Sequence, residues 1–186
     1  MEPSKTYEKY FILLGHDRGI YYYLPMGGGQ VVPLKAPQHD QGHLIALAPK
    51  QFWEQNYGGK QGVDWKCVQD SLIRLQERVG IYDPSRVRGC GAWWDGDHAV
   101  VHAGDRLIIG GKQLPISTPG RYIYQQAIPF DMNHENPLTA DEAAKLLRIC
   151  DLMPWDKPIS ARYLAGWLAL APVCGALKWR PHIWMT

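Results

Sequence analysis

The densest group of potential metal ligands in the sequence lies between residues 95 and 105. It contains Asp95, Asp97, His98, His102 and Asp105. Paired carboxylates in such a stretch could hold Mg²⁺ for phosphoryl transfer. However, Asp95-Gly96 and Gly104-Asp105 have the composition of hairpin turns, where aspartate bonds to nearby backbone amides. We therefore expect turn and strand residues here, and we keep a metal-dependent nucleotidyl transferase using Asp95 and Asp97 as an alternative.

Other polar clusters have the same two interpretations. His16 with Asp17, and His39 and Asp40 with His43, fall in segments that we expect to be turns or loops, although each could form a ligand set. No Gly-x-Ser-x-Gly elbow occurs, and no cysteine stands in a context that would activate it. We therefore predict no catalytic residue, no metal and no cofactor in this chain.

A phosphate-binding loop is also missing from the sequence. ATP binding of the P-loop type needs Gly-x-x-x-x-Gly-Lys-Ser/Thr, whose backbone amides hold the phosphates. The glycine run 27–29 is not followed by such a lysine and joins two expected strands, so we interpret it as a turn. The chain is therefore not expected to be an enzyme by itself.

Arginines and tryptophans in the middle of the chain suggest nucleic-acid binding. The residues we predict to take part are Arg74, Arg78, Arg86, Arg88 and Trp94. Guanidinium groups on one face could bind phosphates, and an outward-facing tryptophan could stack on a base. The alternative is that Arg74 and Arg78 pair with Asp70 or Glu77 on a solvated helix, and that Trp93 and Trp94 belong to a core or interdomain contact.

Length and composition indicate a folded, soluble chain. The chain has 186 residues, 46% of them apolar and 20% charged, with a net charge of +2, so no global basic field indicates nucleic acid or membrane. Four cysteines without a Cys-x-x-Cys pair and a polar amino terminus favour a reduced, cytoplasmic protein. The apolar run 163–177 is short and contains Pro172 and Gly175, so we expect no membrane span.

Turn residues separate short apolar stretches and so predict antiparallel strands. The expected strands are residues 10–14, 20–24, 30–34, 92–94, 99–101, 107–109 and 121–125. Helices are expected over 49–57, from a cap at Asp64 to Gly80, over 140–150 after a capping box of Thr139 and Glu142, and over 161–171 after Ser160. Residues 183–185 are expected to form a buried strand, and the chain is expected to be truncated there.

These elements predict an α+β fold in which antiparallel β-meanders accompany three or four helices. The boundaries we predict are an α+β subregion at 1–80, an antiparallel meander at 81–138, and a helical segment leading into the terminal strand at 139–186. Two subregions meeting near residues 80–90 or 117–139 are the alternative organisation.

Several stretches resemble the large primase/helicase-like proteins of phages and other mobile elements. They are residues 13–25, which contain LGHDRGIYYYLP, LIALAPKQFWE (44–54), RVRGCGAWWDGDHAVVHAGDRLI (86–108) and PISARYLAGWLALAPVCGALKWRPHIWMT (158–186). In that family a region of this type directly precedes a P-loop ATPase, and the segment like RPHIWMT leads into the phosphate loop. The resemblance implies that this chain ends before a P-loop ATPase domain, and it assigns no activity to particular residues.

The resemblance implies a non-catalytic accessory module of a DNA primase/helicase-like ATPase, which positions DNA or a neighbouring subunit. Its expected partners are DNA, the ATPase domain of the same polypeptide and further copies of the chain, with no membrane. The full-length protein would then be an ATP-dependent helicase or primase. The alternative from the residues alone is a stand-alone protein-interaction or oligomerisation module that does not bind nucleic acid.

Overall fold

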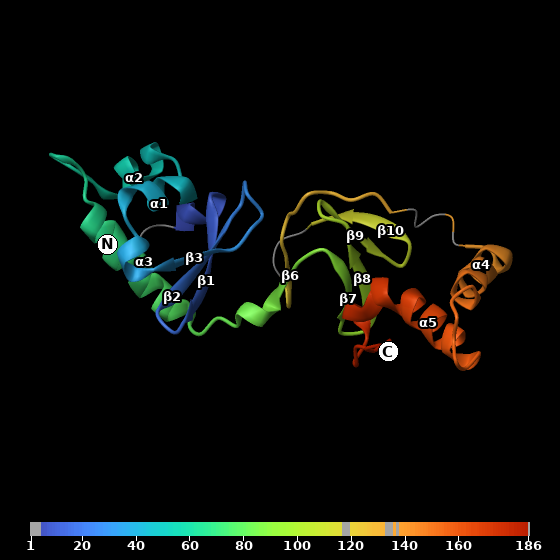
Figure 1. Ribbon diagram of the computed structural model, residues 1–186. Coiled ribbons are helices and arrows are strands. Elements are labelled where there is room, and N and C mark those ends of the chain that lie inside the picture. The colour runs from blue at the N-terminus through green and yellow to red at the C-terminus, as the bar shows by residue number, and fades with distance from the viewer. Residues whose placement is uncertain (1–4, 117–119, 133–135, 137, 186) are drawn as a thin grey trace. The chain divides into compact units, whose positions relative to one another are not determined.

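The computed structural model describes residues 5–116, 120–132, 136 and 138–185. The chain divides into two compact units, unit 1 (residues 1–87) and unit 2 (residues 88–186), which are described separately (Figure 1). Both units combine antiparallel strands with helices, so the α+β prediction is confirmed. The boundary between the two units follows residue 87. The predicted boundaries are after residues 80 and 138, with two subregions meeting near residues 80–90 or 117–139 as the alternative.

Unit 1 contains a three-stranded antiparallel sheet. Its strands are β1 (Phe11–Asp17), β2 (Ile20–Pro25) and β3 (Val32–Lys35), in the order β1-β2-β3. The short 3₁₀ helix η1 (Lys5–Lys9) precedes them. A bulge in β1 between Leu13 and Gly15 shifts the pairing with β2 by one residue. The predicted meander is therefore present, with this irregularity added.

After η1, the helices of unit 1 are the 3₁₀ helices η2 (Ala36–Gln38) and η3 (Pro84–Arg86) and the helices α1 (Gln41–Leu47), α2 (Lys50–Tyr57) and α3 (Trp65–Val79), with a small hairpin of β4 (Gly58–Gly59) and β5 (Gly62–Val63). Aspartate side chains cap α1, α3 and η3 among these helices. The side chain of Asp64 accepts from the Cys67 amide at 3.0 Å, as predicted. Asp40 caps α1 in the same way, so the prediction that His43 lies in a turn or loop is wrong. Because Gly42 is a poor helix former, the sequence pattern did not predict this short helix.

Aromatic rings dominate the core of unit 1. Phe11, Tyr23 and Trp53 are fully buried, and the rings of Phe11 and Trp53 stack with their centroids 6.1 Å apart. The indole nitrogen of Trp53 donates to the carbonyls of Leu44 and Ala48, at 3.0 and 2.9 Å. Trp53 therefore joins α2 to the end of α1 while its ring packs on the sheet.

A buried glutamine joins α3 to the bulge in β1. The Oε1 atom of Gln76 accepts from the Gly15 amide at 2.6 Å, and its Nε2 atom donates to the Tyr22 carbonyl at 2.7 Å. Gly15 has a φ of 108°, and a Cβ atom there would collide with the Gly80 carbonyl. The sequence analysis did not identify Gln76, although it lies four residues after Leu72 on the apolar face of α3.

Unit 2 contains a four-stranded antiparallel sheet in the order β10-β9-β8-β7. Its strands are β7 (Gly91–Asp95), β8 (His98–His102), β9 (Arg106–Ile109) and β10 (Lys112–Pro115). The two-residue strand β6 (Val87–Arg88), which contains the unit boundary, pairs with β11 (Ile123–Tyr124). The predicted meander and the further strand within 121–125 are confirmed.

The helices of unit 2 are α4 (Ala140–Asp151) and α5 (Ile159–Leu170), which continues into the 3₁₀ helix η4 (Ala171–Ala176). The predicted capping box is present: the Glu142 amide donates to Thr139 Oγ1 at 3.3 Å, and the Thr139 amide donates to Glu142 Oε2 at 2.9 Å. Ser160 does not cap α5, because the helix begins at Ile159, two residues earlier than predicted, after Pro158. Proline fixes a helical φ and so starts the helix there.

The predicted strand at 183–185 is wrong, because these residues form neither helix nor strand. No described strand lies beside them to complete a β-ladder. Instead Ile183 packs on the cluster formed by α4 and α5, and the Trp167 indole donates to the Pro181 carbonyl at 3.1 Å. Among the described residues, the segment Ile159–Ala176 is the one helix long and apolar enough to cross a membrane by length and composition, and most of it is exposed.

Replacing Gln76 by leucine is expected to destabilise unit 1 by about 3 kcal/mol, because two buried backbone groups lose their partners. Urea denaturation followed by amide signals of unit 1 would measure the change in the free energy of unfolding. The exposed Gln55→Leu variant in α2 serves as the control, and we expect it to change this free energy by less than about 0.5 kcal/mol. Equal destabilisation by both variants would contradict the role assigned to Gln76.

Candidate nucleic-acid interface

The five residues predicted to bind nucleic acid are divided between the two units. Arg74 and Arg78 lie on α3 and Arg86 ends η3, all in unit 1. Arg88 on β6 and Trp94 on β7 belong to unit 2. Each group is therefore considered within its own unit.

Arg74 is compensated by carboxylates on its own helix. Its Nη1 atom lies 3.1 Å from Glu77 Oε2, and its Nε atom lies 3.6 Å from Asp70 Oδ1. The hydrogen bond and charge of Glu77, with a further contribution from Asp70, raise the pKa of Arg74. This is the arrangement of a solvated helix face that the sequence analysis gave as the alternative, and it makes Arg74 a poor phosphate ligand.

Arg88 lies between two aromatic rings. Its guanidinium carbon is 4.6 Å from the centroid of the Trp93 ring and 4.1 Å from that of Tyr122. The guanidinium of Arg121 lies over Tyr122, at 5.4 Å. We call Trp93, Arg88, Tyr122 and Arg121 the Arg-aromatic ladder. Packing against the rings restricts the orientation of the guanidinium groups of Arg88 and Arg121.

Trp94, which follows Trp93 in the chain, has a half-exposed indole. It follows Trp93 on β7, so the two side chains leave opposite faces of the strand, as predicted. Its side chain is 50% exposed, and its indole nitrogen donates to the Gly96 carbonyl at 2.7 Å. A Cβ atom on Gly96 would lie 3.9 Å from Arg121 Nη1, so a cation lies near the turn that holds the indole.

Nothing in the sequence indicated that Tyr122 and Arg121 belong to the Arg-aromatic ladder. Tyr122 and Arg121 were expected only as part of a strand, and they lie more than thirty residues from Arg88 in the chain. A cation stacked on a ring leaves no periodic pattern in the sequence. The strand signal at 121–125 could have shown only that this segment joins a sheet.

The carboxylates of residues 95–105 have separate partners, and in this stretch, all of which the structure describes, they do not form a cluster of three or more with the histidines. Asp95 accepts from the Tyr124 hydroxyl at 3.3 Å, Asp97 lies 2.6 Å from His98 Nδ1, and Asp105 lies 2.8 Å from Arg106 Nη1. Burial, with a smaller effect of Asp95, raises the pKa of Tyr124 to about 12. Within the described part of the chain, no three His, Cys, Asp or Glu side chains could hold a metal ion together. The geometry thus gives no support to a metal-dependent transferase using Asp95 and Asp97.

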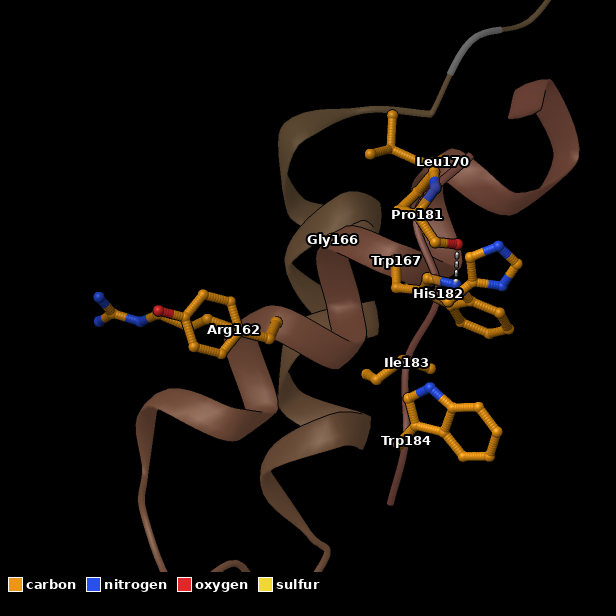
Figure 2. Close-up of a pocket in the computed structure, with 9 residues that line it drawn as sticks. Arg162, Gly166, Trp167, Leu170, Pro181, His182, Ile183 and Trp184 are labelled. Atoms are coloured by element: carbon orange, nitrogen blue, oxygen red, sulfur yellow. Dashed lines mark hydrogen bonds between the residues drawn. The ribbon is translucent and has the colours of Figure 1, made fainter. Parts of the chain in front are cut away.

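A mostly apolar groove runs along α5 in unit 2 (Figure 2). It has a volume of about 640 Å³ and is lined by Arg162, Tyr163, Gly166, Trp167, Leu170, Pro181, His182, Ile183 and Trp184. Trp184 is 91% exposed and Tyr163 68% exposed. Large exposed rings beside a groove are typical of a surface that contacts another protein.

No protein-family model matches the chain, and no curated protein or solved structure shows significant similarity to it.

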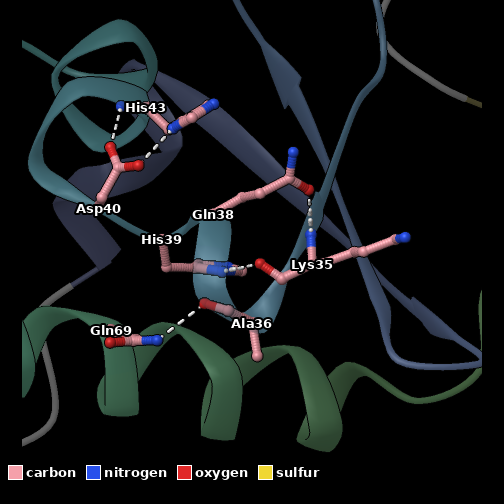
Figure 3. A network of polar contacts seen from close by, with 7 residues as sticks. All are labelled: Lys35, Ala36, Gln38, His39, Asp40, His43 and Gln69. Carbon is pink, nitrogen blue, oxygen red and sulfur yellow. Dashed lines mark hydrogen bonds and ion pairs between the residues drawn. The ribbon is translucent and has the colours of Figure 1, made fainter.

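The other predicted polar cluster, residues 39–43, connects the sheet of unit 1 to α1 (Figure 3). His39 Nδ1 lies 2.9 Å from the Lys35 carbonyl, which can only accept, so this nitrogen carries the proton. His39 Nε2 then accepts from the Tyr23 hydroxyl, at 2.8 Å. His43 instead is exposed and pairs with Asp40 at 2.9 Å. Both histidines have structural partners here.

The buried, neutral His39 predicts acid sensitivity of unit 1. Burial lowers the pKa of His39 below its ordinary value of 6.5, so the unfolded chain binds the proton more tightly than the folded one. Stability should be complete above pH 6.5 and fall by up to about 1.4 kcal/mol per pH unit as the pH drops toward the folded pKa. Urea denaturation from pH 7.5 to 5.0, followed by amide signals of unit 1, measures this.

The variants His39→Gln and His43→Gln separate the two histidines. The first should flatten the pH dependence between 6.5 and 5.0, and the second, at the exposed position, should keep it. If His39→Gln kept the wild-type slope, another group would be responsible for it.

Proposed function

We propose that this chain is a non-catalytic accessory module of a phage or mobile-element DNA primase/helicase-like ATPase, in which it positions DNA or a neighbouring subunit. Two supports combine in this proposal. The first is the resemblance of the four sequence stretches to the region that precedes the P-loop ATPase in that family. The second is the Arg-aromatic ladder of unit 2. The ATPase domain of the same polypeptide would be its constant partner.

The Arg-aromatic ladder is the observation that supports DNA binding. A guanidinium that already packs on aromatic rings loses little conformational entropy when it binds a phosphate. The indole of Trp94, on the opposite face of β7 from Trp93, is fixed by its bond to Gly96 and keeps half of its surface for stacking on a base. Because the chain carries a net charge of only +2, DNA would be held locally by these groups.

Fluorescence anisotropy with single-stranded and forked DNA over a salt series tests the proposal. We expect binding at low salt that weakens as salt increases, because bound phosphates release counterions. The variants Trp94→Ala and Arg121→Ala should each weaken binding by about fivefold or more, through lost stacking and a lost phosphate contact. Arg74→Ala is the matched control, and its affinity should stay within about twofold because Asp70 and Glu77 already compensate this arginine.

Absence of binding at low salt would exclude the DNA part of the proposal. Loss of affinity in Arg74→Ala equal to that in Arg121→Ala would move the site to α3. Circular dichroism of each variant would show that the fold is retained.

The groove along α5 favours a second function, a protein-interaction or oligomerisation module without nucleic-acid binding. Its lining is mostly apolar, and Trp184 and Tyr163 are largely exposed beside it. Buried aromatic side chains supply most of the binding energy in protein interfaces. This function requires no contribution from the Arg-aromatic ladder.

Sedimentation over a concentration series distinguishes the two functions. An interaction module of this kind should self-associate in a salt-insensitive way, and Trp184→Ser with Tyr163→Ser should weaken the association at least tenfold by removing exposed rings from the interface. The DNA-positioning module should bind DNA whether or not these two residues are changed. Association that persists in the double variant would exclude the groove as the interface.

A further inference from the structure

His102 is a buried histidine without hydrogen-bond partners. It lies at the end of β8, between Gly91 on β7 and Leu107 on β9, and is 0% exposed. Neither Nδ1 nor Nε2 has a hydrogen-bond partner. His98 begins the same strand and projects from the same face, yet it is exposed and pairs with Asp97 at 2.6 Å. One strand therefore carries two histidines in opposite environments.

The surroundings of His102 accept only its neutral form. A neutral imidazole has one donor and one acceptor, whereas the protonated ring has two donors and a charge. Burial opposes protonation and lowers the pKa of His102. The Gly89 backbone, which lies near the ring but does not meet hydrogen-bond geometry, and the carboxylate of Asp105 act more weakly in the opposite direction. A buried unpaired charge is far costlier than a buried unpaired dipole.

His102 lies at the junction between the four-stranded sheet and the β6-β11 pair. Its ring packs on Tyr124 of β11, with ring centroids 5.8 Å apart, and the Tyr124 hydroxyl donates to Asp95 of β7. The titratable and charged neighbours of His102 are Tyr124 from β11 and Asp105 from the turn after β8. Tyr124 in turn interacts with Asp95 from β7 and Arg88 from β6. Asp105 is already paired with Arg106, at 2.8 Å, and Asp95 with Tyr124. Neither carboxylate hydrogen-bonds to the imidazole.

We propose that His102 is a pH-sensitive lock of unit 2, whose protonation on acidification separates the β6-β11 pair from the four-stranded sheet. The proton comes from solvent and is taken up when the junction opens, because only the open ring can be hydrated. The proposal concerns the stability of unit 2 and is independent of DNA binding.

The direction of the effect follows from linkage. The folded pKa lies below the ordinary value of 6.5, so the unit is most stable above pH 6.5 and opens more readily as the pH falls toward the folded pKa. In that window the opening equilibrium constant should rise by up to about tenfold per pH unit.

Amide hydrogen exchange of the full chain from pH 7.5 to 5.0, corrected for intrinsic exchange rates, tests the lock. The wild type should show the rise in opening at amides of β8 and β11, and His98→Gln, the matched control on the same strand, should show it too. His102→Leu and His102→Gln should abolish the dependence, since neither side chain titrates. A wild-type response that is flat, or that persists in both His102 variants, would overturn the proposal.

An NMR titration of the wild type keeps the test decisive if the His102 variants do not fold. The His102 imidazole signals should stay in the neutral form as the pH falls below 6.5, for as long as unit 2 remains folded. Protonation of His102 at the ordinary histidine pKa of about 6.5, in a unit that remains folded, would also overturn the proposal.

Discussion

The two hydrogen bonds of Gln76 are the interaction on which unit 1 depends. A β-bulge leaves a backbone amide without a ladder partner, and in β1 this amide belongs to Gly15. The Gln76 amide satisfies it and the neighbouring Tyr22 carbonyl together, so α3 is fixed in both position and rotation against β1 and β2. The next residue extends the attachment, because the His16 amide donates to the Gly80 carbonyl at 3.0 Å. The aromatic core therefore packs against a helix whose position relative to the sheet is fixed by these hydrogen bonds.

In unit 2 the side chain that joins two separate elements is an arginine, where unit 1 uses the side-chain amide of a glutamine. The pair of β6 and β11 is too short to form a stable sheet by itself, since each strand has only two residues. The guanidinium of Arg88 packs between Trp93 of β7 and Tyr122 beside β11, and so links this pair to the larger sheet through its flat faces. Both units therefore use long polar side chains where a small core offers too little apolar surface.

The sequence predicted most elements because their ends have local causes. Asp64 caps α3, Thr139 and Glu142 cap α4, and glycine turns separate the strands of the meander. What it could not predict depends on residues far apart in the chain. Gln76 serves a bulge sixty-one residues away, and the partners of Arg88 include Tyr122. The strand predicted at 183–185 is wrong for the same reason. An apolar run forms a strand only where a neighbouring strand can hydrogen-bond to it, and that neighbour comes from elsewhere in the chain.

The histidines of β8 show why burial is harder to predict than orientation. Their spacing of four residues places His98 and His102 on one face, which alternation along a strand gives correctly. The burial of each side chain is a different property, because it depends on which other parts of the chain cover that end of the strand. His98 lies at the Asp95-Gly96 hairpin, where solvent reaches it, whereas His102 lies under Tyr124 of a strand that begins more than twenty residues later. The burial of the His102 imidazole therefore depends on the return of the chain through β11, and the local motif around residues 95–105 does not contain that information.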